Sequence, residues 1–112
     1  MRIEVRGRNT EVTDELRSHV EKRFARVGRQ ISPLAHLEVE LSEERNPAIT
    51  DREVAEATLH LKGVTLRSSK RSTDMGHSIN LVADDLARQV KKHRDKRRGR
   101  REALREAQER VA

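Results

Sequence analysis

The sequence predicts an α+β fold of the βαβββα type, a two-layer sandwich with a four-stranded mixed sheet and two helices packed on one face. In four short segments, apolar residues alternate with polar ones, as on a half-buried strand. In two longer segments they recur every three or four residues, as on one side of a helix. These segments follow one another as strand, helix, three strands and helix. A strand-helix-strand opening gives parallel strands with a right-handed crossover, whereas strands that follow directly pair antiparallel.

A strand and a helix are expected at the start of the chain. In residues 2–8, Ile3 and Val5 point to one face, and the charged residues Arg2, Glu4 and Arg6 point to the other. Thr13 can cap the helix that follows, because its hydroxyl can accept a hydrogen bond from a free N–H group of the first turn. Gly28 is expected to end this helix. Its apolar stripe comprises Leu16, Val20, Phe24 and Val27.

Three strands are expected next. Residues 36–42 and residues 54–61 both alternate between apolar and polar side chains. A short turn at residues 62–63 leads into a brief strand at residues 64–67. Residues 68–73 are polar and basic, and the pattern predicts a connection there rather than more strand.

The second helix is expected to begin near Asp74. The apolar pattern stops after Val90 while helix-forming residues continue, so the segment from His93 onward can be helical but cannot belong to the core. We therefore divide the chain into a βαβββα domain, residues 1–95, and a basic helical extension or linker, residues 96–112. The apolar stripe of the helix comprises Met75, Ile79, Val82, Leu86 and Val90.

The composition limits what this chain can be. Its 112 residues are the size of one domain, and its core must be aliphatic because Phe24 is the only aromatic residue. The absence of cysteine excludes a disulfide framework, a thiolate zinc site and a cysteine nucleophile. The first residues lack a signal-peptide pattern, and no stretch approaches the roughly 20 apolar residues that span a bilayer. We expect a soluble, cytoplasmic protein with no membrane partner.

The positive charge is concentrated in one block. Residues 1–90 hold fifteen basic and fifteen acidic residues, whereas residues 91–101 hold eight basic residues and one acid, Asp95. A short cationic block beside a neutral domain is typical of an arm that binds a polyanion. With almost no aromatic side chains, base stacking cannot be the main binding term, so we expect structured RNA that is recognised through its backbone and shape.

The strand directions bring a second cationic cluster to this block. If the first strand runs up, both helices run down and end at the same edge, so their basic ends should form one patch. The outer face of residues 36–42 and the loop after it are acidic through Glu38, Glu40, Glu43 and Glu44, so we expect a polarised molecule. The predicted RNA-binding residues are Lys22, Arg23, Arg26, Arg29, Arg88, Lys91, Lys92, Arg94, Lys96, Arg97 and Arg98.

No constellation in the sequence predicts catalysis, a metal or a cofactor. The five histidines are scattered; His36 and His60 could be neighbours across two strands, but we expect ordinary surface histidines. Asp84 and Asp85 are adjacent on a helix, where their side chains point about 100° apart, so they are not expected to form a facing acid/base pair. We expect neither an enzyme nor a small-molecule substrate.

Several segments, in order, resemble one known family. Residues 7–16 and 20–22 look like the opening of the ribosome hibernation promoting factors, also called ribosome-associated translation inhibitors. Residues 44–47 resemble their loop between the second and third strands, most like actinobacterial members. Residues 56–61, with Gly63, Leu66 and Arg67, resemble their third and fourth strands. The second helix is similar at Asp74, Met75, Ile79, Leu86 and residues 88–92, and the resemblance covers about residues 2–98.

The resemblance implies a βαβββα fold and a non-enzymatic inhibitor that promotes ribosome hibernation. It implies that the chain binds the small ribosomal subunit and its 16S rRNA in the mRNA and tRNA channel. Long members add a C-terminal dimerisation domain, so this chain is either a short form or the front part of a long one, and a dimer is expected only if such a domain is missing. The sequence departs from the family pattern at Gly76, Asn80, Asp85 and Ala87.

Two other functions stay open on the sequence alone. One is a protein-binding regulator, for example of transcription, that uses the basic C-terminal arm on another acidic partner. The other is an enzyme that acts on RNA, against which the lack of a nucleophile-base or metal constellation argues.

Overall fold

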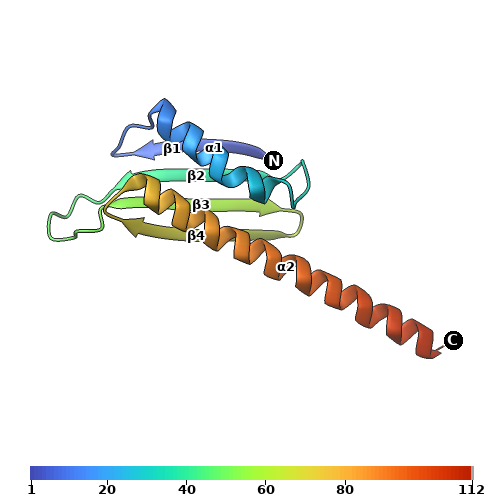
Figure 1. The fold of residues 1–112 in the computed structure, drawn as a ribbon. Helices are drawn as coiled ribbons and strands as arrows, with labels where there is room; N and C mark the ends of the chain where they lie inside the picture. Colours follow the sequence, from blue (N-terminus) through green and yellow to red (C-terminus); the bar gives the residue numbers. More distant parts are fainter. Residues whose placement is uncertain (112) are drawn as a thin grey trace.

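The structure is a computed structural model that describes residues 1–111, and it has the predicted βαβββα order (Figure 1). The sheet order is β1-β2-β3-β4, with β1 parallel to β2 and the other neighbours antiparallel. Both helices lie across one face of this mixed sheet, so the predicted two-layer fold is confirmed. The elements are β1 (Arg2–Arg8), α1 (Asp14–Gly28), β2 (His36–Glu43), β3 (Glu53–Leu61), β4 (Val64–Ser72) and α2 (Met75–Val111).

The core lies between the helices and the inner face of the sheet, and it is aliphatic apart from Phe24, which is fully buried. The periodic residues of the sequence form it. Val20 and Val27 come from α1, and Leu37, Val39 and Leu41 come from β2. Burial of each such side chain contributes about 1.5–3 kcal/mol, which is the main term holding the two layers together. Among residues 1–111, no helix covers the opposite face of the sheet, which is open (Figure 1).

The ends of α1 follow the predicted chemistry. Thr13 is the N-cap, and its Oγ1 accepts a hydrogen bond of 3.2 Å from the backbone N–H of Leu16. Asp14 and Glu15 follow in the first turn, where the helix dipole favours acids. Gly28 is the last helical residue.

The fourth strand is longer than the sequence predicts. β4 continues to Ser72, so the expectation of a connection over residues 68–73 was wrong for all but the last of them. Its backbone pairs with β3 along the whole length, from Leu61 opposite Val64 to Glu53 opposite Ser72. Apolar alternation could not predict residues 68–72 of β4 as strand, because the inward position is taken by the polar Ser68. Ser68 is buried there, and its hydroxyl donates a hydrogen bond to Asp85.

The second helix continues through the segment after His93, which the sequence allowed to be helical. We predicted that Arg88 and Arg94 would lie at its C-terminal end, but α2 runs unbroken to Val111, so these residues are in mid-helix and the helix dipole does not stabilise them there. Its 37 residues span about 55 Å at about 1.5 Å per residue, and its C-terminal part projects beyond the sheet (Figure 1). Side chains of residues 91–110 are exposed, except that His93 is half-buried.

The described helix passes through the predicted domain boundary at residues 95 and 96 without a break, and that boundary stays a prediction. The last residue of the predicted extension, Ala112, lies outside the described residues. Within residues 1–111, neither helix is both long enough and apolar enough to cross a membrane.

Candidate nucleic-acid interface

The two helices lie side by side and run in the same direction. Three contacts, taken in order along both helices, show this. Near the start of both, the His19 ring Nε2 donates to the Asn80 side-chain oxygen at 2.8 Å. One turn later, Arg23 forms an ion pair of 3.1 Å with Asp84. Beyond the end of α1, the Arg94 guanidinium approaches the side-chain oxygen of Gln30 at 3.5 Å. The cationic end of α1 therefore lies beside the basic stretch of α2, as the strand directions predicted.

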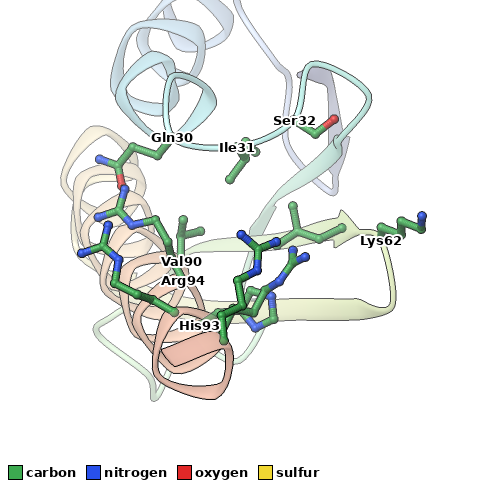
Figure 2. A pocket seen from close by; sticks show the side chains of 11 residues that line it. Gln30, Ile31, Ser32, Lys62, Val90, His93 and Arg94 are labelled. Carbon is green, nitrogen blue, oxygen red and sulfur yellow. The ribbon is translucent and has the colours of Figure 1, made fainter. Parts of the chain in front are cut away.

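A groove of about 390 Å³ opens where α2 leaves the sheet (Figure 2). One wall is the segment after α1, residues 30–32, and another is the end of β3 with its turn, residues 61–62. The third wall is α2, which contributes Val90 and then five cationic or titratable side chains: His93, Arg94, Arg97, Arg98 and Arg101. Ile31 and Leu61 add apolar surface, so guanidinium groups stand over a partly apolar floor.

The groove is suited to phosphate groups. A guanidinium presents a planar fork of N–H donors that can bind two oxygens of one phosphate, and it does so without reading the base. Four arginines on one side of one helix supply several such forks within about two turns. Among the residues that line this groove, none is acidic, so these arginines lack a carboxylate neighbour within it.

Three of the eleven predicted RNA-binding residues line the groove, namely Arg94, Arg97 and Arg98. The prediction missed Arg101, although a signal for it exists. The spacing Val90, Arg94, Arg97, Arg101 continues the apolar stripe of α2 with arginines in place of aliphatic residues, on the same side of the helix.

Lys62 was also missed, because a single lysine in a two-residue turn has no pattern around it. Its neighbour Gly63 has a φ of +79°, a conformation that glycine adopts without strain, and this allows the tight turn from β3 to β4. The turn holds Lys62 at the rim of the groove, with its side chain directed away from the hollow (Figure 2).

The other predicted residues of α2 lie outside the groove. At about 100° per residue, Lys92 and Lys96 lie on the side of the helix opposite Val90. Lys91 is exposed, and Arg88 contacts the Asp85 carboxylate at 3.4 Å. The basic stretch of α2 thus presents charge around the helix, with only one side turned toward the groove.

On α1, the predicted residues are exposed but differ in their surroundings. Arg23 is paired with Asp84, which neutralises part of its charge. Arg29 is the C-cap of the helix, and Lys22 and Arg26 lie on its exposed surface. The two helices therefore bring these cations to one side of the molecule, and their role in RNA binding stays a prediction.

The outer face of the sheet is less acidic than the sequence suggested, because its carboxylates have cationic neighbours. Glu40 lies 3.8 Å from Arg6 and 3.9 Å from Arg8. Glu44 lies 3.8 Å from Arg71. The expected polarity of the molecule is therefore weaker than a count of acids implies, since neighbouring strands carry the opposite charge.

The adjacent acids Asp84 and Asp85 point to different partners, as their helix positions predicted. Asp84 contacts Arg23 of α1, whereas Asp85 accepts a hydrogen bond of 2.6 Å from the Ser68 hydroxyl of β4. The hydrogen bond from Ser68, with a further one from Gln89, holds the pKa of the Asp85 carboxyl below its ordinary value. Asp84 thus links α2 to α1, and Asp85 links α2 to β4.

The fold and the groove define a class: small α+β domains with one open sheet face and a projecting cationic helix. Residues 3–98 match the family described as Sigma 54 modulation protein / S30EA ribosomal protein. The chain is 32% identical to the ribosome hibernation promoting factor of Azotobacter vinelandii over 96% of this chain and 95% of that one. It is 33% identical to the factor of that name from Escherichia coli strain K12, over 86% and 96% of the two chains.

A solved structure and a longer relative point to the same family. The crystal structure of the Thermus thermophilus Protein Y N-terminal domain superposes with a TM-score of 0.72 at 32% identity, covering 83% of this chain and 99% of that one. The chain is 31% identical to a ribosome hibernation promotion factor from Picosynechococcus over 95% of its own length, but spans only 55% of that relative. The chain belongs to the ribosome hibernation promoting factor family, as the resemblance predicted.

Proposed function

We propose that this chain is a non-enzymatic inhibitor of translation that binds the small ribosomal subunit in its mRNA and tRNA channel and promotes ribosome hibernation in the cytoplasm. Membership of the family and the names of the relatives support a role on the ribosome. The observation that supports rRNA as the binding partner is the arginine-lined groove where α2 leaves the sheet, beside the basic end of α1.

The arrangement explains how a chain without aromatic platforms could hold RNA. Arg94, Arg97 and Arg101 face the groove and would bind 16S rRNA phosphates, while Lys91 and Lys92 would neutralise neighbouring phosphates from other sides of α2. The helix would occupy space that mRNA or tRNA needs. No bond is made or broken, so inhibition comes from occupancy alone.

Sedimentation with purified small subunits over a series of salt concentrations tests this proposal. We expect co-sedimentation that weakens steeply with salt, because each phosphate contact releases counterions. The double variant Arg94→Glu/Arg97→Glu should bind more weakly and lower the slope of log K against log salt by about 2. Reversal at Lys91 and Lys92 should weaken binding more than reversal at Glu38 and Glu40.

The matched control is Arg105→Glu/Arg110→Glu, which makes the same charge change near the far end of the same helix. It should lose affinity through the general field but keep most of the salt slope. Equal slopes for the two double variants would contradict a role for the groove. Failure of the wild-type chain to bind small subunits at low salt would contradict the proposal as a whole and favour a protein-binding regulator.

A further inference from the structure

The open face of the sheet carries a cluster of two histidines and two glutamates that the proposed function does not use. The strand register sets it up, because Glu4 of β1 lies opposite Glu38 of β2, and His36 of β2 lies opposite His60 of β3. His36, Glu38 and His60 alternate with buried residues of β2 and β3, and Glu4 lies between Ile3 and Val5, which are half-buried and pack against the core. All four side chains therefore leave the sheet on the face away from the helices.

The polar atoms of this cluster converge. His36 Nε2 lies 3.5 Å from Glu4 Oε2, and the ligand atoms of Glu4, His36 and Glu38 all lie within 4.8 Å of one another. His60 Nε2 lies 3.3 Å from Glu38 Oε2, and the two imidazole rings stand 5.7 Å apart between centroids. Three strands therefore direct imidazole nitrogens and carboxylate oxygens toward one small volume.

One atom of the cluster is unsatisfied. His36 Nε2 is shielded from solvent, and within the described residues 1–111 it has no hydrogen-bond partner, because its contact with Glu4 lacks hydrogen-bond geometry. A shielded polar atom without a partner is destabilising relative to one that is hydrogen-bonded. A neutral imidazole whose proton is on Nδ1 instead has a lone pair at this nitrogen, which is the electron pair that a metal ion takes.

We propose that this cluster is a binding site for a divalent transition-metal ion, best suited to Zn²⁺. Glu4, His36 and Glu38 would each supply one ligand atom, and water would take the fourth position on the open side. His60 would hold the Glu38 carboxylate through its Nε2–H and so act as a positioning residue. One nitrogen with two oxygens favours zinc over Mg²⁺ or Ca²⁺, which take oxygen ligands.

The distances fit such an ion after small side-chain rotations. Zinc bonds of about 2.0–2.1 Å in a tetrahedron place ligand atoms about 3.3–3.4 Å apart. The separation of 3.5 Å between His36 and Glu4 is already close to this value, and the widest separations, up to 4.8 Å, need only closure of glutamate side chains that are partly exposed.

Bound zinc would join β1 to β2, and β1 is an edge strand of the sheet. We therefore expect zinc to raise the thermal stability of the chain, since an ion that binds only the folded state stabilises it. The site lies on the opposite face of the sheet from the helices, so it is independent of the proposed RNA contacts.

The test uses the full chain without an affinity tag. Zn²⁺ titration should raise the unfolding temperature and saturate at one ion per chain, and Co²⁺ should give the visible absorption of a tetrahedral site that Zn²⁺ then removes. His36→Gln should abolish both signals. His60→Gln should weaken binding about 10–100-fold, as expected for a residue that only orients a ligand.

His77→Gln and His93→Gln are the matched controls and should bind zinc as the wild type does. If His36→Gln fails to fold by circular dichroism, Glu4→Gln provides the same loss of a ligand at a more exposed position. A wild-type chain with neither a thermal shift nor a cobalt spectrum would overturn the proposal, and so would equal binding by the folded ligand variants. Ribosome binding is scored separately, so failure of one proposal does not decide the other.

Discussion

At the scale of single residues, three of the four positions at which the sequence was expected to depart from the family pattern make tertiary contacts. Gly76 and Asn80 both accept hydrogen bonds from His19, at 3.2 Å from the Gly76 carbonyl oxygen and 2.8 Å from the Asn80 side chain. Asp85 accepts the Ser68 hydroxyl. The sequence marked these departures but could not assign partners to them, because His19 lies 61 residues from Asn80 and carries no periodic signal.

The Asp85 contact predicts a specific response to acid. Its pKa is lowered below the ordinary value of 3.8, mainly by the hydrogen bond from Ser68, so its contribution is full above that value and is lost as pH falls through the folded-state pKa. We expect Asp85→Asn to lower the free energy of unfolding by about 1 kcal/mol at neutral pH. The difference from wild type should hold down to about pH 5 and then shrink steadily as the solution is made more acidic.

Denaturant titrations at each pH measure this difference. Asp84→Asn is the control, because the Asp84 side chain is mostly exposed and its partner is a surface arginine. A gap between Asp85→Asn and wild type that stays constant as the solution is acidified would contradict the ionised hydrogen bond.

The contact of His19 with Asn80 predicts energetic coupling between the helices. A double-mutant cycle with His19→Ala and Asn80→Ala should give a coupling free energy of about 0.5–1.5 kcal/mol, because each single change leaves a half-buried polar group without its partner. Stability measured by urea unfolding gives the four values required. Simple additivity would mean that this bond does not hold α1 to α2 in solution.

At the scale of elements, apolar periodicity predicted the strands and helices that bury apolar residues and missed what is polar. It predicted β1, β2 and β3 and the start of α2 because their inward positions are aliphatic. It missed the second half of β4, where Ser68 and Lys70 take the inward positions. Apolar periodicity also could not predict whether the chain stays helical beyond Val90. An exposed helix needs no apolar pattern, so only the helix propensity of its residues indicates it.

The exposed stretch of α2 at residues 91–110, here called the arm, allows a direct test of whether it is helical in solution. Gly99 lies within it, and among the described residues nothing lies within 4 Å of a Cβ atom placed there. Gly99→Ala should therefore favour the helix by about 0.8–1 kcal/mol through backbone propensity alone. Helical circular dichroism should rise, and amide exchange over residues 91–110 should slow.

Gly7→Ala provides the opposite case in the same chain, because its Cβ would clash with the backbone oxygen of Thr10. It should destabilise the domain while leaving the arm unchanged. An unaltered spectrum for Gly99→Ala would indicate that the arm is not helical in the free protein.

At the scale of the whole molecule, the charge distribution of the sequence and the strand directions predicted that the basic end of α1 lies beside the basic stretch of α2. Fifteen acids balance fifteen bases in residues 1–90, so the excess positive charge lies in the block at residues 91–101, and the fold places the end of α1 beside that block. The sequence could not show which side of α2 meets the groove, because that depends on where the helix leaves the sheet. It also could not show that arginines on β1 and β4 offset the acids of the sheet.

Electron cryomicroscopy of the full chain on vacant ribosomes tests the central claim most directly. We predict density for the domain on the small subunit, with Arg94, Arg97 and Arg101 of α2 against rRNA phosphates and the open face of the sheet turned away from them. Ribosomes without such density, or a complex in which the sheet face meets rRNA while the arm of α2 projects into solvent, would contradict the account.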